Sequence, residues 1–109
     1  MSVRREAAGL KSVRITVLKV GMAPDLIEKY SIFGKEPYKC DAFKEGQTFV
    51  TKLGRVPEGF CSWAWADIHR DIEILAFGAN YPSTKEKGTA IVCCTDAYRP
   101  VTFKLERIE

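Results

Sequence analysis

The sequence predicts an α+β fold. We expect a small, mainly antiparallel sheet of about four strands, packed by one long and one short helix, in the order β-α-β-α-β-β. Two observations carry this prediction. Apolar and polar residues alternate over 13–19 and over 101–106, as in half-buried strands. Between them, an apolar stripe of helical period runs over roughly 62–77. Closure of so small a sheet into a partial barrel is the alternative arrangement.

The first half of the chain holds a strand, a short helix and a second strand. Residues 13–19, VRITVLK, alternate β-branched and polar side chains and predict the first strand. Pro24 and Asp25 then open a short helix, APDLIEKYS, which Gly34 closes. A loop over 37–41 and a glycine turn lead into a strand over 47–51.

The second half contains the main helix. Trp65, Ile68, Ile72 and Leu75 follow one another at intervals of three, four and three residues, which places them on one face of a helix. Ser62 is a candidate N-cap, and Gly78 ends the pattern as a C-terminal glycine does.

Two strands complete the chain. The apolar run TAIVCCT, residues 89–95, is typical of a strand that is buried on both faces. The final strand follows after a short connection, so we expect an antiparallel hairpin.

Composition indicates one globular domain. The chain has 109 residues, of which 46% are hydrophobic and 28% charged, ordinary values for a chain with a single core. We predict a flexible N-terminal segment over 1–12 and a single domain over 13–109.

The net charge of +3 is concentrated at the N-terminus, so no basic face for nucleic acid is predicted. No apolar run reaches the roughly 20 residues of a membrane span, and no secretory signal is recognised, so we expect a cytoplasmic protein with no membrane partner.

The four cysteines are Cys40, Cys61, Cys93 and Cys94, and a reducing compartment favours free thiols. Neighbouring side chains of a strand point to opposite faces, so Cys93 and Cys94 are not expected to share a site. Cys40, Cys61 and Cys94 are therefore the candidate ligands of a zinc or iron ion, although packing of the thiols in the core is the favoured explanation. His69 lies eight residues after Cys61, roughly 12 Å along a helix, which makes a shared ion awkward. No cofactor is favoured.

Cys61 is also the candidate nucleophile. It stands just before the main helix, where unpaired N–H groups and the helix dipole stabilise a thiolate. Asp67 is the candidate general base. Surface charge is the simpler explanation for Asp67 and its neighbour at i+4, Asp71, because Arg70 lies between them.

Three further residues are candidates for ligand binding. Trp63 falls on the wetter face of the main helix, about 200° from Trp65, so its indole is expected to cover a loop, a second subunit or a flat ligand. Asp96 and Arg99 flank the turn TDAYRP, where Arg99 could hold a carboxylate or phosphate. The predicted ligand-binding set is therefore Cys61, Trp63, Asp67, Asp96 and Arg99.

Three blocks of the sequence resemble a family of small proteins of roughly this length, known mainly from anaerobic bacteria and archaea. The blocks are CDAFKEGQTF, PEGFCSWAWADI and AIVCCTDAYRPVTFKLERI. The resemblance covers residues 13–109 and implies no particular activity. The signature positions it marks are Cys40, Gly46, Gln47, Cys61, Trp63, Trp65, Asp67, Cys94, Asp96, Arg99 and Pro100. The sequence departs from the family pattern at Ala97 and Tyr98, where a glycine is expected after the aspartate.

These observations lead to three hypotheses. The first is a homo-oligomer that binds a small molecule in a pocket at the start of the main helix. The second is a cysteine-centred zinc, iron or redox protein, consistent with an anaerobic host, which requires at least three sulfurs in one site. The third is a small enzyme that uses Cys61 or Asp67.

Overall fold

The structure is a computed structural model that describes Glu6 and residues 8–109. Its elements follow the predicted order of strand, helix, strand, helix, strand, strand. Their bounds are β1 Val13–Val20, α2 Pro24–Tyr30, β2 Thr48–Thr51, α3 Ser62–Ala76, β3 Thr89–Cys93 and β4 Val101–Arg107.

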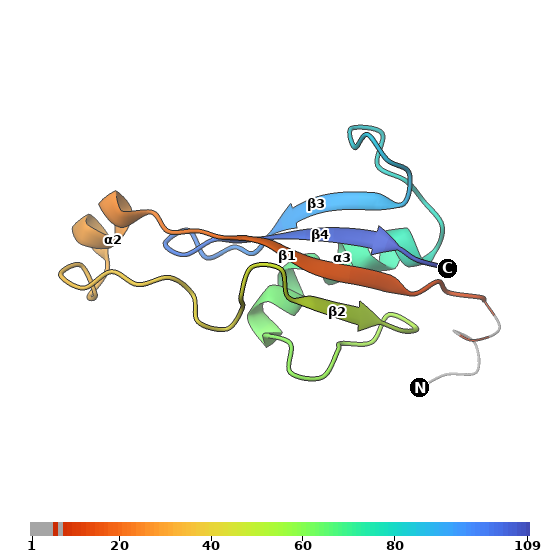
Figure 1. The fold of residues 1–109 in the computed structure, drawn as a ribbon, viewed down its shortest axis with the longest axis horizontal. Coiled ribbons are helices and arrows are strands. Elements are labelled where there is room, and N and C mark those ends of the chain that lie inside the picture. Colours follow the sequence, from red (N-terminus) through yellow and green to blue (C-terminus); the bar gives the residue numbers. More distant parts are fainter. Residues whose placement is uncertain (1–5, 7) are drawn as a thin grey trace.

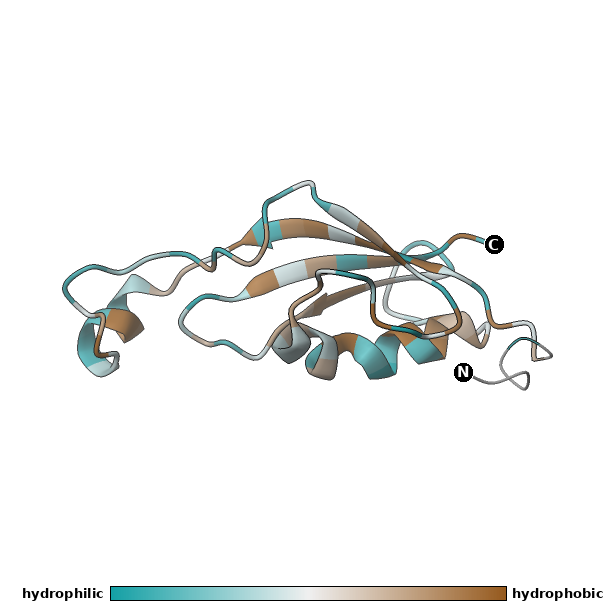
Figure 2. Cartoon of the chain, turned by 90° about the horizontal axis from the view of Figure 1, so that it is seen from below, coloured by the Kyte–Doolittle hydropathy of each residue, from teal (hydrophilic) through white to brown (hydrophobic). Residues whose placement is uncertain are grey.

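The four strands form one antiparallel sheet in the order β2-β1-β4-β3. The predicted α+β class and the hairpin of the last two strands are therefore confirmed. The sheet is open, with β2 and β3 at its edges, so the barrel alternative does not occur. Helix α3 lies along one face of the sheet, beneath β3, β4 and β1 (Figure 2).

The core lies between the sheet and α3. Alternate residues of β1 and β4 point toward the helix, and Ile15, Phe103 and Leu105 are fully buried. From the helix, Ile68, Ile72 and Leu75 meet them, as the apolar stripe in the sequence predicts. Phe43 and Phe60 close one end of this core with ring centroids 5.1 Å apart. Burial of these aliphatic and aromatic side chains is the main force that holds the helix on the sheet.

The N-cap of α3 lies one residue before the predicted cap, Ser62. The N-cap is Cys61, and Ser62 is the first helical residue. The Cys61 side chain makes no capping hydrogen bond, and the first turn contains no acidic residue. The helix ends at Ala76 with Phe77 as its C-cap, and Gly78 follows as the predicted helix-ending glycine, with a φ of +100° that glycine adopts readily.

The prediction that the strand at 89–95 is buried on both faces is wrong. β3 ends at Cys93 and is an edge strand whose outer face is exposed, with Ile91 54% exposed. The apolar run arises because Ala90 and Val92 face the core while Ile91 lies on the uncovered face of the sheet. Sequence periodicity alone does not distinguish this case from a doubly buried strand.

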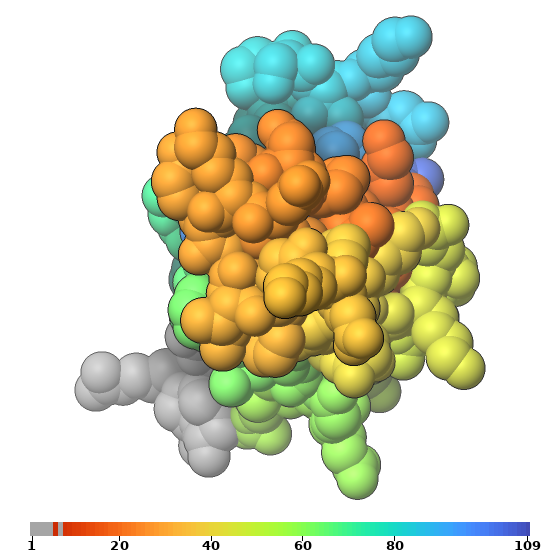
Figure 3. All heavy atoms as spheres, turned by 90° about the vertical axis from the view of Figure 1, so that its left-hand side faces the viewer, coloured from red at the N-terminus to blue at the C-terminus, as the bar shows by residue number. Residues whose placement is uncertain are grey.

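Residues 21–42 form an arm that projects beyond the ends of the strands. Figure 1 shows α2 at the far left, and Figure 3 shows the arm in orange at the centre of that end of the molecule. Two backbone hydrogen bonds hold its root, from Gly21 N–H to the carbonyl oxygen of Pro100 and from Ala23 N–H to that of Tyr98, both 2.8 Å. Within the described residues, α2 contacts neither α3 nor any strand.

The predicted flexible segment over 1–12 falls partly on residues 1–5 and 7, which lie outside the described residues. Of its described part, Leu10 packs into the core, and the Ser12 hydroxyl donates a hydrogen bond to the Glu109 carboxylate at 2.6 Å. Within the described part of the chain, no helix has the length and apolar character needed to cross a membrane.

Candidate functional site

A cavity of about 690 Å³ lies at the N-terminal end of α3. Three parts of the chain form its walls: the loop before β2, the start of α3, and the turn between β3 and β4 with the first residue of β4. The lining residues are Cys40, Asp41, Phe43, Cys61, Trp63, Ala64, Cys94, Thr95, Asp96, Ala97, Tyr98, Arg99 and Val101. The cavity falls within the roughly 300–1,000 Å³ typical of small-molecule sites.

Three of the four cysteines line this cavity. Cys61 reaches it as the N-cap of α3, Cys94 follows β3, and Cys40 comes from the loop before β2. The sulfur of Cys94 accepts a hydrogen bond from the backbone N–H of Val101, at 3.3 Å. Cys93 is exposed and is absent from the cavity wall. The predicted separation of Cys93 from Cys94 follows from the alternation of side chains along the strand.

The pKa of Cys93 is raised. Burial is the larger cause and the neighbouring Cys94 the next, while a hydrogen bond from Thr102 acts in the opposite direction. Cys93 therefore carries less thiolate at neutral pH than an ordinary cysteine would.

Trp63, Thr95 and Asp67 form a hydrogen-bonded chain at the edge of the cavity. The indole N–H of Trp63 donates to the Thr95 hydroxyl oxygen at 3.0 Å. The Thr95 hydroxyl and backbone N–H donate in turn to the Asp67 carboxylate, at 3.0 and 2.8 Å. Asp67 itself does not line the cavity. Its place is behind the wall, where it ties the turn after β3 to α3.

Asp96 and Arg99 form an ion pair in the turn before β4. One carboxylate oxygen of Asp96 lies 3.2 Å from Nη2 of Arg99, and the other accepts the backbone N–H groups of Tyr98 and Arg99. The Arg99 guanidinium lies 4.7 Å from the centre of the Tyr38 ring. Although burial acts to lower the pKa of Arg99, the charge of Asp96 and the contact with Tyr38 outweigh it and raise the pKa.

No metal-binding geometry is present among the described residues: no three His, Cys, Asp or Glu side chains there are arranged to hold one ion. His69 is engaged elsewhere, as its separation from Cys61 predicts. Its Nε2 lies 3.2 Å from the carbonyl oxygen of Gly54 and 3.1 Å from Glu73 Oε1, and its ring stacks on Trp65.

The structure thus gathers four of the five predicted ligand-binding residues in one wall, namely Cys61, Trp63, Asp96 and Arg99, and sets Asp67 behind it. Sequence reasoning missed Thr95 and Tyr98, which line the cavity, and Tyr38, which contacts Arg99. Nothing in the spacing of these residues marks them, because loop folding alone brings them to the site.

The sequence interpretation of Asp71 as surface charge is wrong. Asp71 is buried, at 8% exposure, and accepts a hydrogen bond from the hydroxyl of Tyr81. The pKa of Tyr81 is raised to about 12 by burial, by this hydrogen bond and by the negative charge of Asp71.

The cavity wall combines aromatic rings, three thiols, two carboxylates and one guanidinium. Such a wall can bind a small molecule through apolar contact and a few directed polar contacts, or supply a thiol for covalent chemistry. No family model matches the chain, and comparisons with curated proteins and with solved structures find no match.

Proposed function

We propose that this protein is a homo-oligomer that binds a small molecule in the cavity at the start of α3. The observation that carries the proposal is the convergence of Cys61, Trp63, Asp96 and Arg99 on one cavity of about 690 Å³. The side chains come from separate segments of the chain, and hydrogen bonds or an ion pair hold Trp63, Asp96 and Arg99. A wall positioned in this way loses little conformational entropy when a ligand binds.

A fragment screen followed by NMR tests the binding proposal. We expect some neutral fragments to shift the indole N–H resonance of Trp63. Ala97→Trp should abolish these shifts, because Ala97 is exposed in the wall and a larger side chain there fills the cavity. Ala79→Trp, on an exposed loop outside the cavity, is the matched control and should retain them. Fragments that bind Ala97→Trp as well as the wild type would refute the proposal.

The oligomeric part of the proposal rests on Trp63, which is 65% exposed. Tryptophan is enriched in protein interfaces because it buries a large apolar area. Light scattering coupled to size-exclusion chromatography should give a multiple of the 12.3 kDa chain mass. Trp63→Lys should lower that mass to the monomer, whereas Phe77→Lys, at the opposite end of α3 and 66% exposed, should not. A monomeric mass at every protein concentration would contradict the proposal of a homo-oligomer.

A second candidate function is cysteine-centred chemistry, and the observation that favours it is the presence of Cys40, Cys61 and Cys94 in the same wall. A zinc or iron site would require these side chains to move together, because they do not form a metal site as they stand. Reaction of Cys61 as a nucleophile or redox thiol requires no such movement. Asp67 is the weaker candidate base, because Thr95 donates to both of its oxygens.

Elemental analysis of protein purified without oxygen separates these versions. Zinc or iron in a stoichiometric amount, lost in Cys61→Ser and retained in Cys93→Ser, would support the metal version. If neither metal is present in a stoichiometric amount, the metal-site hypothesis is excluded and thiol reactivity of Cys61 is the hypothesis that remains.

A further inference from the structure

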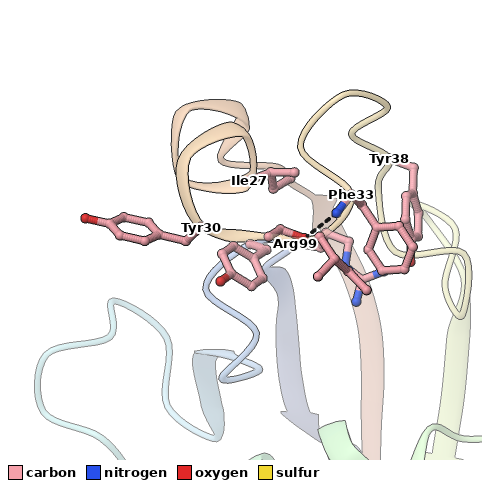
Figure 4. Close-up of a pocket in the computed structure, with 8 residues that line it drawn as sticks. Ile27, Tyr30, Phe33, Tyr38 and Arg99 are labelled. Atoms are coloured by element: carbon pink, nitrogen blue, oxygen red, sulfur yellow. Dashed lines mark hydrogen bonds between the residues drawn. The ribbon is translucent and has the colours of Figure 1, made fainter.

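A second cavity, of about 310 Å³, lies in the arm between α2 and the turn before β4. Its wall is mostly aromatic and aliphatic and includes Ile27, Tyr30, Phe33, Tyr38, Tyr98 and Arg99. Figure 4 shows Phe33 and Tyr38 beside Arg99, while Tyr30 extends away from them on the other side. The hypotheses drawn from the sequence do not use this cavity.

The arm holds the cavity open by its own packing. Ile27 of α2 is 3% exposed and forms the apolar floor. The loop after α2 folds back tightly against the helix, so that a Cβ at Gly34 would lie 2.8 Å from the carbonyl oxygen of Glu28. Phe33 and Tyr38 meet edge to face, with ring centroids 5.5 Å apart, and Arg99 stacks on Tyr38. These contacts join Phe33, Tyr38 and Arg99 into one wall of the cavity.

The charges around the cavity favour an anion. Arg99 is the one charged side chain among the described residues that line it. Asp96 pairs with Nη2 of Arg99 but belongs to the wall of the first cavity. A guanidinium carries five N–H donors, so donors remain for a ligand beyond those engaged by Asp96 and Tyr38. The arm cavity therefore presents a cation beside aromatic rings, and this cation is also paired with Asp96, which does not line the cavity.

The rim of the cavity has exposed apolar surface that a ligand would cover. Ile32 is 92% exposed and Tyr30 65% exposed, and both line the opening. Removal of such surface from water favours binding. The small volume admits one or two fused rings rather than a large cofactor.

We propose that the arm cavity is a second binding site, for a small planar aromatic carboxylate whose rings lie against Phe33 and Tyr38 and whose carboxylate accepts hydrogen bonds from Arg99. The site goes beyond the proposed function, because it shares only Tyr98 and Arg99 with the first cavity.

Calorimetric titration with 2-naphthoate, compared with the neutral 2-naphthamide, tests the proposal. The two probes have nearly the same shape, and only the first carries a charge. We expect 2-naphthoate to bind on the order of tenfold more tightly, because charge-assisted hydrogen bonds are roughly twice as strong as neutral ones. Equal affinities, or no binding of 2-naphthoate at millimolar concentration, would overturn the proposal.

Matched phenylalanine variants locate the site. Phe33→Ala should weaken 2-naphthoate binding roughly fivefold to tenfold, as expected for the loss of one aromatic contact. Phe77→Ala removes an exposed ring outside both cavities, 66% exposed against 49% for Phe33, and should leave binding unchanged. In the wild type, NMR shifts caused by 2-naphthoate should concentrate on Ile27, Phe33 and Tyr38, which gives a test independent of how well the variants fold.

The outcome also separates this proposal from the proposed function. Shifts at Trp63 and Cys61 without shifts at Phe33 would overturn the arm site and leave the first cavity as the binding site. Shifts confined to the arm, together with a fragment screen that finds no shift at Trp63, would support the arm site and overturn binding in the first cavity.

Discussion

The carboxylate of Asp67 accepts two hydrogen bonds from Thr95, one from the backbone N–H at 2.8 Å and one from the hydroxyl at 3.0 Å. Because Asp67 belongs to α3 and Thr95 follows β3, this contact fixes the cavity wall relative to the helix. The Thr95 hydroxyl oxygen in turn accepts the indole N–H of Trp63. Asp67 thus positions the cavity wall from behind.

We predict that Asp67→Ala lowers the free energy of unfolding by about 1 kcal/mol, the usual net value of such hydrogen bonds at a partly exposed position. Asp67→Asn keeps one carbonyl acceptor for Thr95 and should cost less. Urea denaturation measures the stability of both variants. The indole N–H resonance of Trp63 should shift in Asp67→Ala even without ligand, and an unchanged resonance would contradict the positioning role.

Removal of the Tyr81 hydroxyl should destabilise the fold. In Tyr81→Phe the buried carboxylate of Asp71 loses its donor, which costs roughly 1–3 kcal/mol. The effect depends on pH in a definite direction. The pKa of Tyr81 is raised to about 12 in the folded protein from an ordinary value of 10, so this contribution is complete below pH 10 and is lost as the pH rises toward 12. The difference between wild type and Tyr81→Phe in urea unfolding should therefore shrink from pH 9 to pH 11.5.

The reactivities of the thiols should differ. The raised pKa of Cys93 leaves little thiolate at neutral pH, whereas Cys61 is the N-cap of α3 and lines the cavity. We predict that iodoacetamide alkylates Cys61 faster than Cys93 at pH 7, although Cys93 is the more exposed of the two. Peptide mass spectrometry over time measures both rates in one sample. Faster labelling of Cys93 would count against a reactive Cys61.

Arg107 donates hydrogen bonds to backbone carbonyl groups at and just after the C-terminal end of α3. Its guanidinium donates to the carbonyl oxygens of Leu75 and Ala79 at 3.0 and 2.8 Å, and to the side chain of Asn80 at 2.8 Å. Arg107→Ala should lower the free energy of unfolding by roughly 1–3 kcal/mol, and Arg107→Lys should recover only part of it, because an ammonium lacks the planar fork. Arg70→Ala, on an 82% exposed side chain, is the control and should change stability by no more than about 0.5 kcal/mol. Thermal unfolding compares the three variants.

The sequence alone predicted the fold class, the order of the elements and the main helix. Those features rest on short-range patterns: the alternation along 13–19, the stripe from Trp65 to Leu75, and the helix-ending Gly78. Spacing also separated Trp63 from Trp65 correctly, since only Trp65 packs against the core. Local periodicity decides which face of an element is apolar.

The tertiary structure decided what each face meets. The order of the strands made β3 an edge, and so left Ile91 exposed in a run that reads as buried. Contacts between distant segments gave Asp71 its partner Tyr81 and brought Tyr38 to Arg99. Pairings across many residues depend on how loops close and which strands are neighbours, and no local pattern encodes them. For this reason the sequence pointed to Cys61, Trp63 and Arg99, but only the fold joined them in one wall and opened a second cavity in the arm.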